Sequence, residues 1–426
     1  MSALDRFDRD FGRALLDLAA PRTPDYFDDV LERAVSRRQR PAWTFPERWL
    51  PMGVLARRPA YAPALPWRMI GLLIIMGLLL AILLAIGFGA LLQRTAPPYG
   101  LAANGPVVYS ENDNIYSRDL ETGTATLLVG GPEMDLGATF SRDGTRFSFV
   151  RITDQEPETI ALMVANADGS NVRTVVEPEV AGETHWHEWS PRGDVLVLVN
   201  SADGVPPLSV VNVIGEPQRR VISVPLEIHQ VDWRPGGDEL IFIGRDPEAR
   251  PSALGFHAVR VDGTGLRELV PAPTSGRHHG PFSLSHDGRF LAYTSANSGG
   301  HVSSHILDLD SGETRTLGGW FNQAWATFSP DGERLALVRY PATGSTAQAF
   351  IGSAGGDGTD AVAIGPEVRN QPNTPGLRIQ FSPDGTNLLI VHAAAREAWV
   401  ADVATGGYES IALGEGEWVS WQRLAP

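Results

Sequence analysis

The sequence predicts an all-β fold, a seven-bladed propeller, preceded by a short α-helical segment and one transmembrane helix. Three observations lead to this prediction: a short phrase recurs at intervals of 40 to 53 residues, each repeat holds a second turn, and one run of 24 residues carries no charge. The first two observations define strands and blades, and the third defines a membrane anchor.

The phrase consists of an aromatic or large apolar residue, a polar residue, a turn pair and glycine. Its copies are Phe140–Gly144, Trp189–Gly193, Trp233–Gly237, Leu284–Gly288, Phe328–Gly332 and Phe381–Gly385, and its opening returns at Val419–Trp421. Ser-Pro-Asp suits the first three positions of a type I turn, and glycine at the fourth permits the bulged exit of an antiparallel hairpin. Because an apolar run follows each glycine, each phrase joins two strands.

A second strand pair follows in every repeat around another turn, as at Asp168-Gly169. Each repeat therefore holds four strands. Four strands at a period in the forties are typical of a β-propeller blade and not of a helical solenoid.

The ends of the repeat region decide the number of blades. Residues 105–131 supply three strands without a first one, and residues 416–422 supply a first strand with nothing after it. Joined together, they complete a seventh blade. A six-bladed propeller is the alternative if the C-terminal strand does not pair.

The phrase resembles the WD40-like repeat, also called PD40, of the TolB-like propeller family, in which an aromatic-Ser-Pro-Asp-Gly stretch marks the first hairpin of each blade. The resemblance covers residues 105–426 and implies the propeller fold. Asp143, Asp287, Asp331 and Asp384 occupy the third position of their turns, so we interpret them as turn residues and not as a carboxylate site.

The amino-acid composition excludes several kinds of functional site. The chain has no cysteine and no lysine, which excludes a disulfide framework, a thiolate metal site, a cysteine nucleophile and a lysine phosphate loop. Neither a Gly-x-Ser-x-Gly elbow nor a His-Glu-x-x-His pair occurs, and no residues remain for a separate hydrolase domain. We therefore expect neither an enzyme nor a cofactor.

Met69–Leu92 is the uncharged run, and it is long enough to cross a bilayer at about 1.5 Å per residue. Trp67, Arg68 and Arg94 flank it as interfacial anchors. Because ordinary sequence precedes the run, we interpret it as a single-pass anchor and not as a cleaved signal peptide.

The arginines orient this anchor. Arg57, Arg58 and Arg68 lie on its N-terminal side against Arg94 on the other, which predicts a cytoplasmic N-terminus and an extracytoplasmic propeller in a bacterial cell membrane. Residues 69–426 hold 23 basic and 41 acidic residues, a net charge of −18. We therefore expect no nucleic-acid partner.

The predicted organisation is a cytosolic amphipathic helical segment (1–40), a Pro/Trp/Arg-rich juxtamembrane linker (41–68), the transmembrane helix (69–92), an outer linker (93–104) and the propeller (105–426). Within the span, small residues recur every four positions at Gly77, Ala81, Ala85 and Gly89. Such a stripe lets two helices approach closely and predicts a homodimer, although Leu-, Ala- and Gly-rich spans also produce stripes by chance.

Two short amphipathic helices are expected within residues 1–40, the second opened by Thr23-Pro24-Asp25. They are a docking element for a cytosolic protein or, alternatively, a hairpin lying on the membrane. The layout of short cytosolic helices, one span and an outer domain is similar to that of membrane-bound anti-sigma factors and implies a sigma factor as partner. The zinc site of such proteins does not carry over, because the chain has no cysteine and no histidine before His185.

Polar and aromatic residues near the start of the first strands form the candidate ligand site. His185 and His229 each stand four residues before a phrase tryptophan, and first strands line the channel of a propeller. The predicted rim comprises Glu183, His185, His187, His229, Gln230, His278, His279, Trp320, Asn322, Gln323 and Asn370. An ordinary polar channel lining is the alternative, and no metal-ligand set is assigned.

The sequence therefore favours a non-enzymatic, membrane-anchored propeller that binds a ligand or protein and acts as a sensor or regulator of a cytosolic partner. A propeller enzyme acting on envelope glycans or peptides is one alternative. A structural scaffold of an envelope complex is another.

Overall fold

The computed structural model describes residues 71–80, 95–182, 185–203, 207–248, 254–273, 277–299, 301–318, 323–340, 346–369, 377–414 and 418–425. At 277–281, 323–325 and 393 it describes the backbone alone. The chain divides into two compact units, Met1–Gly89 and Ala90–Pro426.

In the first unit, residues 71–80 are helical and their apolar side chains are exposed, Leu72 by 66%. Within the described ranges, none of the helices has both the length and the apolar character needed to span a bilayer. The two predicted cytosolic helices, the linker 41–68 and the remainder of the predicted span lie outside the described residues, as do Ala81, Ala85 and Gly89 of the small-residue stripe.

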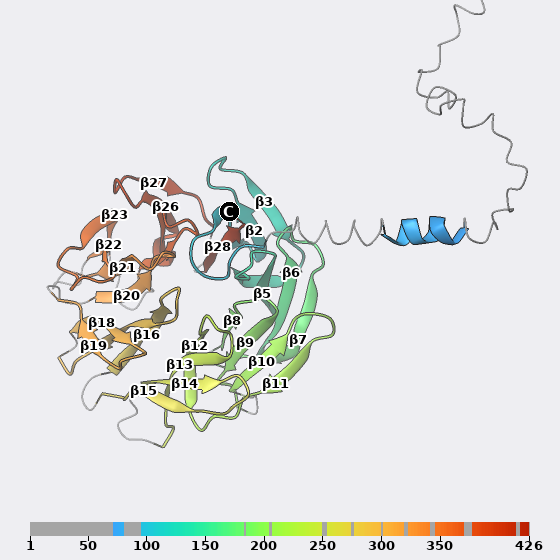
Figure 1. Cartoon of the computed structure of the whole chain (residues 1–426). Helices are drawn as coiled ribbons and strands as arrows, with labels where there is room; N and C mark the ends of the chain where they lie inside the picture. Colours follow the sequence, from blue (N-terminus) through green and yellow to red (C-terminus); the bar gives the residue numbers. More distant parts are fainter. Residues whose placement is uncertain are drawn as a thin grey trace, which may run out of the picture. The chain divides into compact units, whose positions relative to one another are not determined.

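The second unit consists of seven four-stranded antiparallel sheets arranged in a ring (Figure 1). From the channel outward, the sheets are β28 (Val419–Leu424), β1 (Ala103–Glu111), β2 (Asn114–Arg118), β3 (Ala125–Val129); β4 (Met134–Phe140), β5 (Arg146–Gln155), β6 (Glu158–Asn166), β7 (Arg173–Val180); β8 (His185–Trp189), β9 (Val195–Asn200), β10 (Leu208–Asn212), β11 (Gln218–Val221); and β12 (Glu227–Trp233), β13 (Glu239–Arg245), β14 (Gly255–Arg260), β15 (Arg267–Val270). The last three are β16 (Arg277–Leu284), β17 (Phe290–Ala296), β18 (Val302–Asp308), β19 (Thr314–Thr316); β20 (Gln323–Phe328), β21 (Arg334–Arg339), β22 (Thr346–Ser353), β23 (Val362–Arg369); and β24 (Leu377–Phe381), β25 (Asn387–His392), β26 (Glu397–Asp402), β27 (Tyr408–Ile411), with a short 3-10 turn, η4 (Ala393–Ala395), before β26.

The first sheet joins the two ends of the repeat region. Strand β28 pairs antiparallel with β1, placing Trp421 opposite Val107 and Ser420 opposite Val108. The Trp421 indole Nε1 donates to the Gly105 carbonyl at 2.8 Å. The predicted seven-bladed propeller is therefore confirmed, and the six-bladed alternative is wrong. Strand β1 begins at Ala103, two residues before the predicted start of the propeller.

Each phrase forms the turn that its residues predict. In the first copy, the Gly144 amide donates to the Ser141 carbonyl at 2.9 Å, and Gly144 adopts a φ of 70°. The Ser141 hydroxyl donates to Asp143 Oδ1 at 2.6 Å, and that carboxylate also accepts the Thr145 amide. The same serine–aspartate bond recurs in three further copies, so these aspartates are turn residues.

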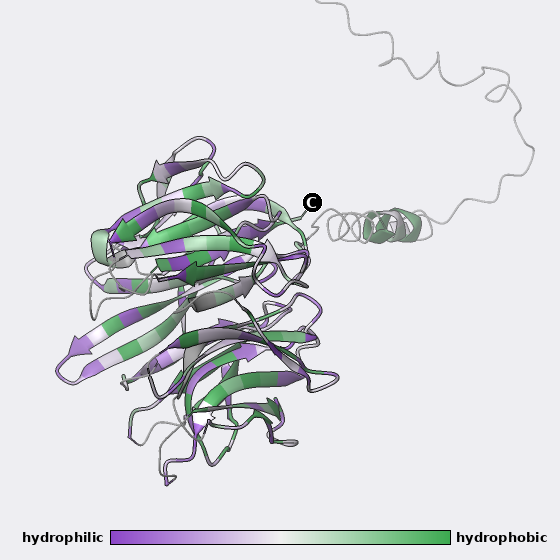
Figure 2. Ribbon diagram, turned by 90° about the vertical axis from the view of Figure 1, so that its left-hand side faces the viewer, coloured by the Kyte–Doolittle hydropathy of each residue, from purple (hydrophilic) through white to green (hydrophobic). Residues whose placement is uncertain are grey.

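The core lies between neighbouring blades. One apolar cluster joins Val197 and Val210 of one blade to Trp233 and Phe242 of the next. Figure 2 shows hydrophobic and hydrophilic residues alternating along the strands, as expected where side chains point to opposite faces of a sheet. The phrase aromatics are buried in this core, and burying one such side chain contributes roughly 1.5–3 kcal/mol.

Candidate functional site

The residue directly before the aromatic residue of each phrase, or before Leu284 in the copy that has leucine there, faces the central channel. Side chains alternate along a strand, so the neighbour of a residue buried between blades points the other way. These seven ring positions are all polar and line two adjoining cavities of about 350 and 560 Å³. They are Thr139, Glu188, Asp232, Ser283, Thr327, Gln380 and Ser420.

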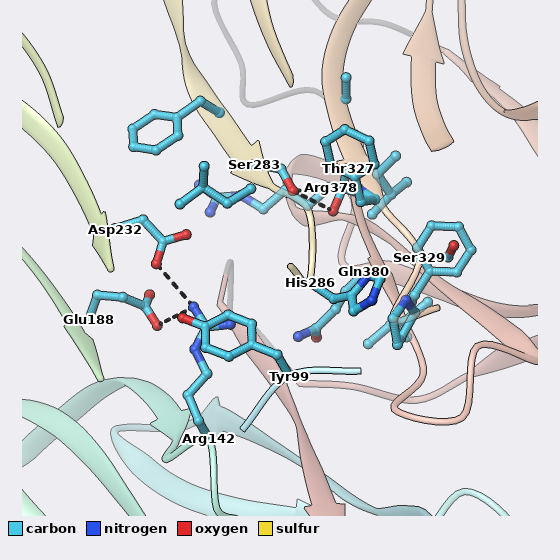
Figure 3. A pocket seen from close by; sticks show the side chains of 18 of the residues that line it. Tyr99, Arg142, Glu188, Asp232, Ser283, His286, Thr327, Ser329, Arg378 and Gln380 are labelled. Atoms are coloured by element: carbon cyan, nitrogen blue, oxygen red, sulfur yellow. Dashed lines mark hydrogen bonds and ion pairs between the residues drawn. The ribbon is translucent and has the colours of Figure 1, made fainter. Parts of the chain in front are cut away.

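A charged cluster occupies the end of the channel where the phrase turns lie, which we call the turn-side mouth. Arg142 Nη2 lies 3.3 Å from Glu188 Oε1 and 3.1 Å from Asp232 Oδ1. Figure 3 shows both carboxylates directed at this guanidinium. The Arg142 guanidinium thus forms ion pairs with two carboxylates, which come from neighbouring blades.

The two carboxylates have perturbed acidities. Burial raises the pKa of Glu188 to about 7, because Arg142 only partly offsets the lost hydration and Asp232 adds repulsion. Burial likewise raises the pKa of Asp232, again against the attraction of Arg142. Burial therefore favours the protonated form of both carboxyl groups, and Arg142 opposes it.

Residues 95–102, which we call the strap, lie against the turn-side mouth. The Tyr99 hydroxyl donates to the Trp233 carbonyl at 3.2 Å, and the Arg142 guanidinium lies 4.8 Å from the centre of the Tyr99 ring. Burial raises the pKa of Tyr99, so its phenol is neutral. The predicted outer linker is in this part a docked segment and not a simple spacer.

Arg423 on β28 holds the main chain of the strap. Its Nη2 donates to the Gly100 carbonyl at 2.6 Å and to the Pro97 carbonyl at 2.9 Å. At the C-terminal end of the strap, the Ala102 amide donates to the Pro383 carbonyl at 2.9 Å. The strap is thus attached both to the closing strand and to a phrase turn.

An aromatic and polar group lies two residues earlier on the inner strands, further from the phrase turns. Trp186 and Trp418 meet edge to face with ring centres 4.9 Å apart, and the Arg378 guanidinium lies 3.8 Å from the centre of the Trp418 ring. Around the larger cavity, Trp186 Nε1, His187 Nε2 and Gln380 Oε1 are buried and have no hydrogen-bond partner within the described part of the chain.

Some predicted rim residues reach these cavities. His185, which is exposed, and His187 line the larger one, and Gln230 lines the smaller one. Burial, with repulsion from His185, lowers the pKa of His187 to about 4. His229 on β12 is half-buried and lines neither cavity, and burial lowers its pKa.

The structure describes only the backbone of three other predicted rim residues, and it does not describe the remaining four. The backbone of His278 and His279 lies in β16 and that of Gln323 in β20. Glu183, Trp320, Asn322 and Asn370 lie outside the described residues. Over the ranges that the structure describes, no three His, Asp or Glu side chains are grouped so that they could hold a metal ion.

Sequence reasoning missed Arg142, Tyr99, Arg378, Trp418 and the ring positions as a set. A signal for the ring existed in the alternation of each inner strand. A second signal was that Arg142 and His286 stand in their phrases where four other copies carry proline, and both line the smaller cavity.

The fold and the channel define a seven-bladed β-propeller with a polar central site. No family model matches the chain. An uncharacterized protein of Agrobacterium fabrum is 24% identical over 166 residues, which is 37% of this chain and 55% of that protein. The chain therefore matches about half the length of this curated relative.

Similar solved structures are propellers of diverse activity. Oligogalacturonate lyase in complex with manganese aligns with a TM-score of 0.53 at 13% identity over 75% of this chain and 88% of that one. A prolyl endopeptidase aligns with a TM-score of 0.51 at 12% identity over 77% of this chain and 51% of that one. TolB from Acinetobacter baumannii aligns with a TM-score of 0.45 at 16% identity over 76% and 81%. The alignments with TM-scores of 0.53 and 0.51 at such low identity show a similar fold alone, so the function must be argued from the site.

Proposed function

We propose that this protein is a single-pass, membrane-anchored propeller that binds a ligand or a segment of a partner in its channel. The observation that carries the proposal is a cavity of about 560 Å³ lined by Trp186, His187 and Gln380, each of which has a buried polar atom without a hydrogen-bond partner in the described part of the chain. A buried polar group without a partner costs roughly 1–3 kcal/mol, so a ligand that draws these side chains into hydrogen bonds would recover that cost.

The same atoms describe the ligand. The Trp186 indole is only a donor and the Gln380 amide oxygen only an acceptor, so the ligand must offer both an acceptor and a donor. The Trp186 and Trp418 rings add flat apolar surface. A polar ligand with a flat face, such as a saccharide or peptide of the cell envelope, fits this combination.

The test uses the full chain in detergent and a panel of envelope saccharides and short peptides, with binding read by tryptophan fluorescence. Trp186→Phe removes one donor and should weaken any binding about tenfold. Trp399→Phe is the matched control, because Trp399 lies on β26 and is partly buried against the apolar core. Equal effects of the two substitutions would refute a channel site, and no binding by any member of the panel would favour the scaffold function.

The membrane topology belongs to the same proposal. The uncharged run 69–92 and the arginines on its N-terminal side support a cytoplasmic N-terminus and an extracytoplasmic propeller in a bacterial cell membrane. Phosphatase fused after Pro426 should be active, and the same reporter fused after residue 60 should be inactive. The reverse pattern would contradict the orientation.

We also propose that residues 1–40 couple the protein to a cytosolic partner such as a sigma factor, as the sequence layout suggests. Pull-down with residues 1–60 should recover that partner, and recovery of no cytosolic protein would favour the scaffold. The small-residue stripe supports a homodimer. An oligomerisation reporter on the span should lose its signal with Gly77→Ile and Gly89→Ile.

An enzyme is the second candidate, favoured by the acidities of Glu188 and Asp232. A carboxyl group with a pKa near 7 beside another carboxylate is suited to proton transfer. Any turnover of envelope glycans or peptides by the full chain should fall at least about a hundredfold in Glu188→Gln. Turnover unaffected by Glu188→Gln, or its absence with every substrate, would dismiss this candidate.

A further inference from the structure

The strap occupies the turn-side mouth as a ligand would. Tyr99 contributes a ring beside Arg142 and a hydroxyl bonded to the Trp233 carbonyl. Arg423 holds the carbonyls of Pro97 and Gly100. A side-chain anchor combined with main-chain recognition is the way proteins hold short extended peptides.

We infer that the strap is an autoinhibitory plug: Tyr99 closes the turn-side mouth, and a ligand can reach Arg142, Glu188 and Asp232 from that side only by displacing it. The inference rests on the proposed function in one respect, namely that the channel binds ligands. It adds that the two mouths differ, since the strap covers the turn-side mouth and the Trp186–Trp418 group lies toward the other.

The composition of the strap favours a reversible plug. Pro97 and Pro98 restrict the backbone before docking, so little conformational entropy is lost when the strap binds. Covalent attachment gives the strap an effective concentration on the order of millimolar at the mouth. A strap of modest intrinsic affinity therefore remains docked until a tighter competitor arrives.

The position of the strap in the chain gives the plug a regulatory consequence. The strap follows the uncharged run 69–92 closely in sequence. A ligand that displaces the strap lengthens the free tether between that run and the propeller. Linkage is reciprocal. A partner that binds only the undocked strap therefore raises the affinity of the turn-side mouth for its ligand by the same factor by which that ligand raises the affinity of the partner.

The first arm of the test measures docking in the full chain by hydrogen–deuterium exchange. Peptides that cover residues 95–104 should be protected in the wild type, because the Ala102 amide is bonded to Pro383 and the strap is held by Arg423. In Tyr99→Ala their exchange should be at least about tenfold faster. Tyr99→Phe keeps the ring, loses only the bond to Trp233 and should give an intermediate rate.

The matched control for Tyr99→Ala is Tyr408→Ala, since Tyr408 is 53% exposed on β27. It should leave exchange of residues 95–104 unchanged. Exchange of this segment at the free-chain rate in the wild type would overturn the inference.

The second arm adds the strap sequence as a separate molecule, the capped hexapeptide Ala-Pro-Pro-Tyr-Gly-Leu that corresponds to residues 96–101. Labelled hexapeptide should bind the Tyr99→Ala protein at least about tenfold more tightly than wild type or Tyr408→Ala, because only the first has a vacated mouth. Adding Arg423→Ala to Tyr99→Ala should abolish this binding.

Equal binding to all proteins, or binding to none, would overturn the plug. A wild-type melting temperature of Tyr99→Ala is the check that the variant is folded. Failure of the plug is distinguishable from failure of the proposed function, because the Trp186→Phe experiment keeps the strap intact and measures binding of envelope saccharides and peptides, not of the strap hexapeptide.

Discussion

Trp233 donates its indole N–H to the main-chain carbonyl of Glu188, 3.1 Å away, across the boundary between two blades. Trp189 makes the same bond to the Thr139 carbonyl of the blade before it, also at 3.1 Å. In each case the acceptor is a ring position. The phrase aromatic therefore fixes the residue that presents its side chain to the channel, so blade packing and site geometry are coupled.

Trp233→Phe should destabilise the full chain by about 2 kcal/mol, because it leaves the Glu188 carbonyl unpaired and removes buried volume. Thermal and denaturant unfolding in detergent measure this cost. Trp399→Phe is the control and should cost less than about 1 kcal/mol, since Trp399 is only partly buried. Equal costs would mean that the bond between blades contributes nothing.

Deletion of Glu415–Pro426 should abolish cooperative unfolding. The deletion removes β28, exposes the pairing edge of β1 and takes away the Trp421 bond to Gly105. Ser420→Ala is the milder comparison: it removes only the hydroxyl that accepts the Phe140 amide and should cost about 1–2 kcal/mol with cooperativity intact. A truncated chain that melts as sharply as the wild type would contradict closure by β28.

Glu188→Gln should change how stability depends on pH. Because burial raises the pKa of Glu188 from 4.5 to about 7, the folded chain holds more protons than the unfolded chain between these values, and wild-type stability falls as pH rises through this window. Above about pH 7, the destabilisation by the charged Glu188 carboxylate is complete. Across this range, the free energy of unfolding of the variant should rise relative to that of the wild type, by up to about 3 kcal/mol at pH 8.

The measurement is the difference between the two unfolding free energies at several pH values, which cancels groups common to both proteins. A difference that does not vary from pH 4.5 to pH 8 would show that Glu188 has an ordinary pKa.

Glu239→Gln should cost about 1–3 kcal/mol. Glu239 is 8% exposed and accepts hydrogen bonds from Arg234 and Arg267, so a neutral amide leaves two guanidinium groups without their anion. Glu227→Gln is the matched comparison, because Glu227 pairs with Arg245 where both side chains are well exposed. It should cost less than about 1 kcal/mol, and similar costs for the two variants would refute the role of burial.

The repeat was predictable from the sequence because it is local. Ser141, Asp143 and Gly144 form their turn with bonds that span at most five residues, so the phrase encodes its own hairpin. The seventh blade was predictable for a different reason. Three strands without an inner partner and one strand without a sheet have a single way to satisfy both edges.

The site was only partly predictable. The structure places His185, His187 and Gln230 beside the channel cavities, a few residues from a phrase tryptophan, and their role in binding a ligand stays a prediction. Tyr99 was missed because its partner Trp233 is 134 residues away, and Arg423 is 326 residues from Pro97. No local pattern encodes contacts of that separation, and proline-rich residues after an uncharged run give no sign of a docked segment.

Ring closure has a consequence for the order in which the chain matures. Strand β28 follows all other strands in the chain, and the Trp421 bond to Gly105 closes a loop of 316 residues. During synthesis, β1 to β3 remain an incomplete sheet with an unpaired inner edge, and such an edge can pair with strands of other chains. Because Arg423 lies on β28, the strap also loses its main-chain anchor until then. Until β28 is synthesised, the propeller has both an open ring and an undocked strap, and a chaperone would protect it most during this interval.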